Sequence, residues 1–425
     1  MNYYRAECVF LCGLAILFLA VSPVAASEWP QWRGPFLNGS SDEKGLPERW
    51  TKEDGVLWTA PMPGEGGSTP VIQGGCVFLT STDRKNNDLH AICLDARNGK
   101  TRWTKIFSGE GRSVPYNKDA APSAIADGTR VYFLFGTGDF ASYDYQGNEV
   151  WRRNLEADHG ALTQLFLYGA SPLLFRNRLY LSVLRGNPGG EAHYPKEIVE
   201  PHESFLLCVD PDTGRDIWRV RRHFEDTAPE NLDSYATPAV WESGSLAEIL
   251  AIGANYLTAH DWLTGQENWR MRYMEEGKYR QRVVPSPVVV GDRVVCSKPR
   301  CGPLFSIRPG RKGEIPFDEC EWEYEGLTPD VPSVLSYGGR LYAIHDSKKT
   351  LTCLDPESGG KIWEGKLEGE AIYHASPTGA DGKIYCMNLA GEIVVVRAAD
   401  EFHILSRISM GGKPSMSTIA VADGC

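Results

Sequence analysis

Short apolar runs alternate with tight polar turns along most of the chain. The runs Leu89–Leu94 and Phe205–Val209 each lead into an Asp, and extended-propensity stretches such as Asp216–Arg219 follow the turn. Other runs are broken by Gly-Gly or Asp-Gly, as in Val71–Leu79 and Pro377–Tyr385, which is typical of hairpins. The pattern predicts an all-β chain of many short antiparallel strands.

The turns share a spaced Asp, Gly and Trp. In four copies Gly lies four residues before Trp and Asp eight before it, and a fifth copy is shortened by one residue in the turn. An Asp side chain can accept hydrogen bonds from the N–H groups of a tight turn, and Gly supplies the positive φ needed to leave it. The Trp at the same place in each unit is expected to pack between neighbouring units. The copies are Asp95, Gly99, Trp103; Asp144, Gly147, Trp151; Asp210, Gly214, Trp218; Asp261, Gly265, Trp269; and Asp355, Gly359, Trp363.

A second repeated mark opens another apolar strand in each unit. It is a triplet of small residues, mostly with Pro, and it occurs eight times. The triplets begin at Ser68, Ala121, Ala170, Ala236, Pro285, Val331, Ala375 and Met416.

Four strands per unit, repeated radially, predict a β-propeller of eight blades with the last one incomplete. Residues 68–410 are expected to form seven full blades, and residues 414–425 a partial last blade. Residues 55–64, which contain Trp58, are predicted to return as the outer strand of that last blade, where they would close the ring. The chain has no residues for the two middle strands of this blade, so the closure is expected to be incomplete.

The N-terminus predicts export. Residues 1–26 contain Arg5, an apolar run and a small-residue end, which is typical of a signal peptide cleaved near Ala26. A periplasmic or secreted monomer without a transmembrane anchor is therefore expected. Residues 27–54 are interpreted as a Trp- and Pro-rich strap over the disc, ahead of a propeller at 55–425.

The amino-acid composition and net charge limit the classes of partner that the protein is expected to bind. The 425 residues are 42% apolar and 11% aromatic, enough for a large core, and the net charge is −11. An anionic surface argues against nucleic acid as a partner.

Nine cysteines remain after the signal peptide, an odd number, so at least one has no partner within the chain. Cys93, Cys208 and Cys353 each lie two residues before a repeated Asp and are interpreted as small buried apolar residues. Cys296 and Cys301 lie between two apolar runs and are a candidate disulfide across a hairpin.

The Asp-x-x-Thr-Gly-x-x-x-Trp repeat with its Ser-Pro strand starts resembles the pyrroloquinoline-quinone-like (PQQ-like) propeller repeat over nearly the whole mature chain. The opening Trp29–Pro35 segment is similar to that of a group of exported bacterial PQQ-like proteins. The resemblance implies one of two functions. Quinoprotein dehydrogenases hold PQQ with calcium in the central funnel, whereas BamB-like proteins are scaffolds of outer-membrane assembly. The adjacent cysteines common in the dehydrogenases do not occur here, and no calcium ligand set can be transferred.

Residues just before the inner strands are expected to rim the funnel and to contact a ligand or partner. The alternative is that their Tyr and His side chains pack between blades. These candidates are Lys118, Asp119, Tyr168, Tyr235, Tyr373 and His374.

The sequence predicts no catalytic, cofactor-binding or metal-binding residues. The insertion 185–204 is interpreted as a polar loop and a candidate partner-binding feature. The sequence thus favours a non-catalytic scaffold that binds a protein or an envelope component, without a cofactor. The alternatives are a PQQ-dependent oxidoreductase with calcium, and a carbohydrate-binding propeller.

Overall fold

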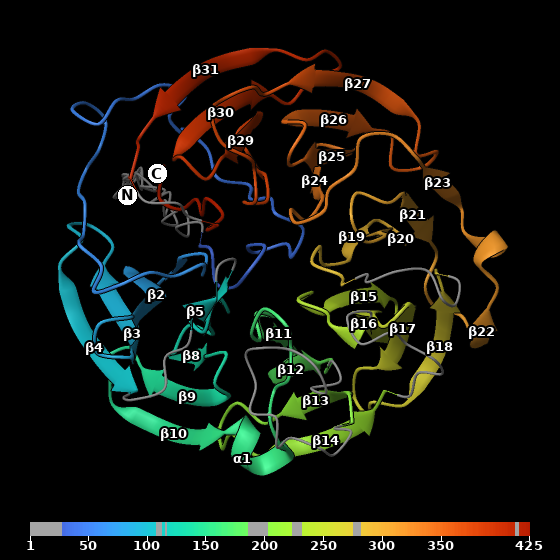
Figure 1. Ribbon diagram of the computed structural model, residues 1–425, viewed down its shortest axis with the longest axis horizontal. Helices are drawn as coiled ribbons and strands as arrows, with labels where there is room; N and C mark the ends of the chain where they lie inside the picture. Colours follow the sequence, from blue (N-terminus) through green and yellow to red (C-terminus); the bar gives the residue numbers. More distant parts are fainter. Residues whose placement is uncertain are drawn as a thin grey trace, which may run out of the picture.

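Seven sheets stand radially around a central axis in the computed structural model (Figure 1). It describes residues 28–107, 113–114, 117–185, 203–222, 232–274, 282–412 and 416–425. The predicted signal peptide and most of the insertion 185–204 lie outside the described residues. The all-β propeller predicted from the repeats is the observed fold.

The first four sheets follow chain order from blue to yellow in Figure 1, except that the fourth also contains the later, orange strand β22. Their strands are β1 (Val71–Gln73), β2 (Cys76–Asp83), β3 (Asp88–Asp95) and β4 (Thr101–Phe107); β7 (Ile125–Ala126), β8 (Arg130–Leu134), β9 (Asp139–Asp144) and β10 (Glu149–Asn154); β11 (Leu173–Phe175), β12 (Arg178–Val183), β13 (Phe205–Val209) and β14 (Asp216–Arg221); and β15 (Ala239–Ser243), β16 (Leu246–Gly253), β17 (Tyr256–Asp261) and β18 (Glu267–Arg272) with β22 (Gly313–Ile315).

Three further sheets complete the described set. Their strands are β19 (Val288–Val290), β20 (Arg293–Ser297), β21 (Leu304–Ile307) and β23 (Trp322–Tyr324); β24 (Leu335–Tyr337), β25 (Arg340–His345), β26 (Thr350–Leu354) and β27 (Lys361–Lys366); and β28 (Thr378–Ala380), β29 (Lys383–Met387), β30 (Glu392–Arg397) and β31 (Ile404–Ser409). Smaller elements are the pair β5 (Ser113–Val114) and β6 (Asn117–Lys118), helix α1 (Leu155–His159) and a 3-10 turn at Phe317–Glu319.

The Asp turns join the third and fourth strands of their sheets. In the sixth sheet, Asp355 Oδ1 accepts hydrogen bonds from the N–H groups of Glu357 at 3.0 Å and Ser358 at 2.8 Å. Gly359 leaves this turn with φ +68°, and a Cβ there would lie 2.6 Å from the ring of Trp322 in the preceding sheet. The turn therefore needs Gly for its φ and for the close approach of the indole.

Each of these indoles connects its own segment of chain to the turn of the following sheet. Trp322 Nε1 donates a hydrogen bond to the carbonyl oxygen of Pro356 at 3.0 Å. The same arrangement joins Trp58 to Ala96, Trp103 to Tyr145, Trp151 to Pro211, Trp218 to Leu263, and Trp363 to Ala399.

Trp269 departs from the rule. Its Nε1 donates to Glu248 Oε2, within its own sheet, at 2.9 Å. The fifth sheet replaces the short Asp turn with a long connection, whose strand β22 pairs in parallel with β18, with Gly313 opposite Trp269. The indole is covered by this added strand and is 1% exposed.

The core is divided among apolar clusters that lie mostly between adjacent sheets. Phe78 of the first sheet packs edge-on against Phe133 of the second, with ring centroids 6.4 Å apart. At the end of the series, Tyr385 and Val395 of the last sheet pack against Trp29 near the N-terminus and Val421 near the C-terminus. The segments at the two ends of the described chain therefore cover the last sheet.

The predicted outer strand at 55–64 is absent: these residues form no strand. A strand needs a hydrogen-bonded neighbour, and no middle strand among the described residues lies beside this segment. Trp58, Ala60 and Met62 nevertheless pack on the apolar face of the first sheet, against Ile92 and its neighbours. Residues 416–425 likewise form no strand. Within the described chain, no helix has the length and apolar character required to cross a bilayer.

A chain of hydroxyl groups lines the axis where the inner strands begin. Each hydroxyl oxygen accepts a hydrogen bond from the backbone N–H of the equivalent residue in the preceding unit, which ties neighbouring sheets together at the centre. The N–H to oxygen pairs are Thr69–Ser123, Ser123–Ser171, Ser171–Thr237, Thr237–Ser286, Ser286–Ser333 and Ser333–Ser376 at 2.9–3.0 Å, and Thr418–Thr69 at 3.3 Å.

Candidate functional site: the central funnel

The N-terminal strap closes one end of the axial channel. Trp29 exchanges two backbone hydrogen bonds with Ile72 of β1, each at 2.9 Å, and the Gly379 N–H of β28 donates to Gly39 at 3.0 Å. The strap also bonds to inner strands of other sheets, through Pro30 to Ala126, Gln31 to Leu174, and Asn38 to Ser336. It therefore crosses the axis and connects the first sheet to the last, as the dark blue segment in Figure 1 shows.

Arg33 fixes the strap from inside. Its guanidinium donates to the carbonyl oxygens of Asn38 at 2.8 Å and Pro377 at 3.5 Å, and also to that of Val334. Burial lowers the pKa of Arg33 to about 9. A cation held in this way is tolerable because several carbonyl dipoles point at it.

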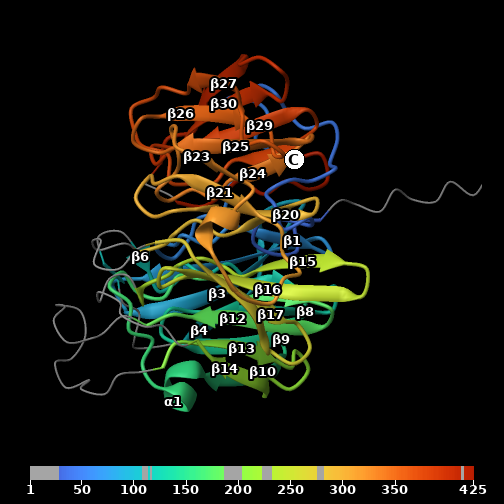
Figure 2. The same ribbon diagram turned by 90° about the vertical axis from the view of Figure 1, so that its right-hand side faces the viewer.

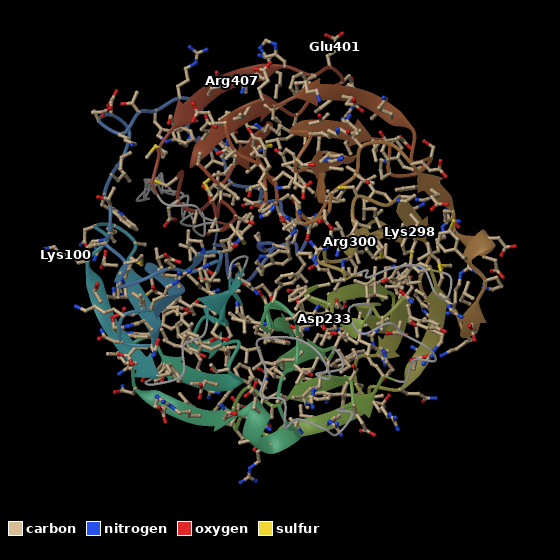
Figure 3. The ribbon with its side chains drawn as sticks, viewed as in Figure 1. Lys100, Asp233, Lys298, Arg300, Glu401 and Arg407 are labelled. Carbon is tan, nitrogen blue, oxygen red and sulfur yellow. The ribbon has the colours of Figure 1, made fainter. Side chains whose placement is uncertain are left out.

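Above the strap lies a cavity of about 500 Å³, with Trp32 among its lining residues. Its lining combines charged groups with aromatic and aliphatic side chains, a composition typical of ligand pockets. Side chains along the axis and at the rim can be compared in Figure 3, where Arg300 and Asp233 lie near the centre and Lys100, Glu401 and Arg407 at the periphery.

The charged part of the lining is built around Asp330. Arg282 donates to both of its carboxylate oxygens, at 3.1 and 3.0 Å, and the backbone N–H of Arg300 donates to Oδ1 at 3.1 Å. Such a paired, bidentate geometry fixes the direction of both side chains. His374 lies in the same lining. Burial is the main cause that lowers the pKa of its imidazole, and the negative charges of Asp346 and Asp330 partly offset this effect.

The apolar part is built around Phe166 and Tyr235. Their ring centroids are 6.3 Å apart, and the Phe166 N–H donates to the Tyr235 hydroxyl oxygen at 3.0 Å. Val284 and Ile372 extend this surface. The funnel thus presents aromatic and cationic groups together.

Two of the six candidate rim residues, Tyr235 and His374, line this cavity. Tyr168 and Tyr373 do not: both are fully buried, and their hydroxyls donate to the carbonyls of Ser182 and Glu368 within the sheets. The structure therefore places these two side chains inside the protein and away from the cavity.

The other two candidates also lie outside the lining. Asp119 is fully buried, and its carbonyl accepts a hydrogen bond from the Gly136 N–H at 2.8 Å. Lys118 lies in β6 and pairs with Glu65 at 3.7 Å. Burial is the main cause that lowers the pKa of the Lys118 amine.

Sequence reasoning missed the charged lining. Asp330 directly precedes the triplet at Val331, and Arg282 lies three residues before the triplet at Pro285, as Lys118 does before Ala121. The rule that selected the candidates therefore applies to both. Trp32 had no such signal, because its place depends on how the strap crosses the axis.

The candidate disulfide between Cys296 and Cys301 is not formed, and the described cysteines are free. Cys296 lies in β20 opposite Phe305 and is buried between sheets. Cys301 lies in the β20–β21 turn with φ +57°, where its sulfur is 3.9 Å from Asp346 Oδ1. The two side chains therefore have different surroundings, with Cys296 packed between sheets and Cys301 beside Asp346. Cys93, Cys208 and Cys353 are free and fully buried.

A second hollow, of about 600 Å³, lies against the other side of the strap. Phe36 of the strap, Phe175 and Arg176 are among its lining residues, and Phe36 is 53% exposed. Phe166 comes before β11 and Arg176 after it, so the funnel cavity and this hollow lie at opposite ends of an inner strand.

The fold and the funnel define a propeller of PQQ-like repeats. The sequence profile of the family described as outer membrane protein assembly factor BamB matches residues 48–186 and 319–408, more than half of the chain. The chain therefore belongs to this family. Among curated proteins, no sequence matches it.

Solved structures show the same fold. BamB from Moraxella catarrhalis is 16% identical, with a TM-score of 0.54, 80% of this chain covered and 85% of that one. A europium-containing methanol dehydrogenase is 10% identical, with a TM-score of 0.65 and coverages of 92% and 87%. The quinohemoprotein alcohol dehydrogenase from Comamonas testosteroni is 12% identical, with a TM-score of 0.60 and coverages of 92% and 74%. At these identities the likeness concerns the fold alone.

The described funnel does not fit a calcium-bound quinone. Calcium takes six to eight oxygen ligands, usually with several carboxylates. Asp330 is the one carboxylate in the described cavity lining, and its two oxygens already accept hydrogen bonds from Arg282 and Arg300. The Asn117 side-chain oxygen accepts from the Lys118 N–H at 2.9 Å. This donor set offers no cage for a hard divalent cation.

Proposed function

We propose that this protein is an exported, non-catalytic scaffold of the BamB type, which binds a protein partner of the cell envelope at the open end of its funnel. Membership of the assembly-factor family supports this proposal. A signal peptide at residues 1–26 is part of it, and fractionation of expressing cells should place the mature chain in the periplasm or the medium.

The observation that carries the proposal is the funnel itself. The strap blocks one end, and the cavity above it has two arginines against one carboxylate, beside Phe166 and Tyr235. Aromatic residues and arginines are the side chains that most often dominate protein interfaces. The cavity suits a peptide segment with an acidic and an apolar side chain. The one carboxylate of the described lining, Asp330, is paired with Arg282, so this carboxylate is not free to act as a general acid or base.

Site-specific cross-linking tests where the partner binds. Phe166 and Phe36 are each replaced by the photoreactive residue p-benzoylphenylalanine, which preserves an aromatic side chain at both ends of the channel. After irradiation in intact cells, Phe166 in the funnel should give a defined adduct, whereas Phe36 on the other side of the strap should not.

A charge variant tests whether Arg282 contributes to binding of the partner. Arg282→Met in the Phe166 photoprobe chain should reduce the adduct at least about tenfold, the smallest change expected when a charge-assisted hydrogen bond of about 1.5–3 kcal/mol is lost. Arg176→Met, at the opposite hollow, is the matched control. An adduct from Phe36 alone, or one unaffected by Arg282→Met, would place the partner elsewhere.

A further inference from the structure

Three side chains with metal-binding atoms meet between the fifth and sixth sheets. Cys301 lies in the turn after β20, His345 is the last residue of β25, and Asp346 follows it. One potential ligand atom from each lies within 4.8 Å of the other two, and within the described chain no other group of three meets this condition. None of the three belongs to the lining of the funnel cavity.

Two of the separations match a tetrahedral metal site. Cys301 Sγ lies 3.9 Å from Asp346 Oδ1, and His345 Nδ1 lies 3.6 Å from the same oxygen. Ligands bound to zinc at about 2.0–2.3 Å in tetrahedral directions are about 3.5 Å apart. The longest separation in the cluster, which is at most 4.8 Å, needs to shorten by no more than about 1.3 Å to reach that arrangement.

The turn holds Cys301 in place before any ion arrives. Its backbone has φ +57°, in the left-handed region that is unfavourable for a residue with a Cβ. The Thr328 hydroxyl donates to the Cys301 carbonyl at 2.7 Å, and the Gly302 N–H donates to Pro299 at 2.9 Å. Strain of this kind persists where the surroundings fix the residue, and such residues cluster at functional sites.

Among the described residues, no Lys or Arg side chain pairs with the carboxylate of this cluster. The Asp346 side chain is 7% exposed and accepts a hydrogen bond from the Ser347 N–H at 2.8 Å. Among the described residues it forms no ion pair with Lys or Arg, and the His345 imidazole is its one basic neighbour within 4 Å. A buried carboxylate requires an opposite charge or several hydrogen bonds.

We propose that Cys301, His345 and Asp346 bind one zinc ion, with a fourth position open to water or to a side chain of another molecule. A thiolate, an imidazole and a carboxylate suit zinc, whereas calcium and magnesium prefer oxygen ligands alone. A thiolate and a carboxylate carry two negative charges, so the occupied site is neutral. Since the ligands come from two sheets, the ion also joins those sheets.

Metal analysis tests the site directly. The purified mature chain is incubated with zinc sulfate, dialysed against metal-free buffer and measured by inductively coupled plasma mass spectrometry. The expected result is one zinc per chain.

Cys301→Ala and Asp346→Asn should each weaken zinc binding at least about 100-fold, because each removes a direct ligand. Cys320→Ala, which removes a partly buried thiol outside the cluster, should retain one zinc. Less than 0.1 zinc per chain, a threshold of about one-tenth of the stoichiometry for a single site, or an equal loss in Cys320→Ala, would overturn the proposal.

Cobalt provides a readout that does not depend on the variants folding. Cobalt(II) bound by the unaltered chain should show thiolate-to-metal charge transfer in the near ultraviolet and intense tetrahedral bands in the visible. Cobalt bound without a thiolate band would contradict the assignment of Cys301. A chelator should lower the melting temperature of the zinc-loaded chain and leave that of a folded Cys301→Ala variant unchanged.

Discussion

The backbone N–H of Thr418 donates a hydrogen bond to the side-chain oxygen of Thr69 at 3.3 Å, across 349 positions of sequence. The Ser417 hydroxyl donates to the carbonyl of Ser68 at 2.9 Å beside it. The C-terminal segment therefore continues the axial chain of hydroxyls into the first unit, although it forms no strand. The centre of the propeller is joined at this point by side chains and not by a sheet.

Thr69→Val tests the contribution of this junction. The substitution keeps the shape of the side chain but removes the oxygen, so the Thr418 N–H loses its acceptor in a buried place. The free energy of unfolding should fall by about 1–3 kcal/mol. Ser286→Ala, in the middle of the chain of hydroxyls, is the comparison and should lower it similarly. Urea unfolding measures the free energy of unfolding of both variants. An unchanged value for Thr69→Val would show that the junction between the two ends does not contribute to stability.

Gly99→Ala tests the docking of Trp58. Gly99 has φ +67°, and a Cβ there would lie 2.3 Å from the indole of Trp58. Gly128→Ala is a matched control, because Gly128 also has a positive φ, +95°, but a Cβ at Gly128 would meet no atom within 4 Å. Both variants carry backbone strain, and Gly99→Ala should lose about 1–3 kcal/mol more through the clash. Equal losses in thermal unfolding would mean that Trp58 does not dock there in solution.

His260 should make stability depend on pH. The side chain is fully buried, with Nδ1 3.0 Å from the Gly265 carbonyl and Nε2 3.0 Å from Thr258 Oγ1. Burial is the main cause that lowers the pKa of His260 to about 4. A folded-state pKa below the unfolded value of about 6.5 stabilises the protein above pH 6.5, and this stabilisation is lost as the pH falls toward 4.

The corresponding measurement compares His260→Gln with the unaltered chain by urea unfolding at pH 7 and pH 4.5. The unaltered chain should lose roughly 2.5 kcal/mol more than the variant over this interval, since glutamine does not titrate. The exposed His403→Gln is the control substitution. Parallel pH profiles for His260→Gln and the unaltered chain would contradict the assignment.

Arg33→Met should release the strap. The variant leaves the carbonyls of Asn38, Val334 and Pro377 without their donor, which should lower the free energy of unfolding by about 3 kcal/mol. Hydrogen exchange should then accelerate at Gly39 and Ser41, whose N–H groups bond to Arg33 and Gly379. Arg49→Met, at an exposed arginine of the same strap, should leave both properties unchanged.

The repeats could be predicted because their signal is local. The Asp, Gly and Trp of each turn lie within nine residues, and the small triplets that open the inner strands became the hydroxyls of the axis. Trp269 could not be distinguished from the others in this way. Its different partner depends on β22, which returns from the next sheet and pairs across the boundary.

The candidate site was predicted less well, because it depends on contacts between distant segments. Tyr235 and His374 could be chosen by their place before an inner strand, but so could Tyr168 and Tyr373, which turned inward to carbonyl partners. No sequence spacing relates Trp32 to Phe166 or Cys301 to Asp346. Their proximity exists only after the strap has crossed the axis and the fifth and sixth sheets have packed together. Figure 2 shows that stacking of sheets from the side.

The functional account depends on the funnel receiving a partner and not a quinone cofactor. Equilibrium dialysis of the mature chain with PQQ and calcium, followed by dye reduction with alcohols and sugars, tests this most directly. The account predicts that no quinone is retained above the buffer level and that no dye is reduced. One PQQ bound per chain, with turnover of an alcohol or a sugar, would contradict it.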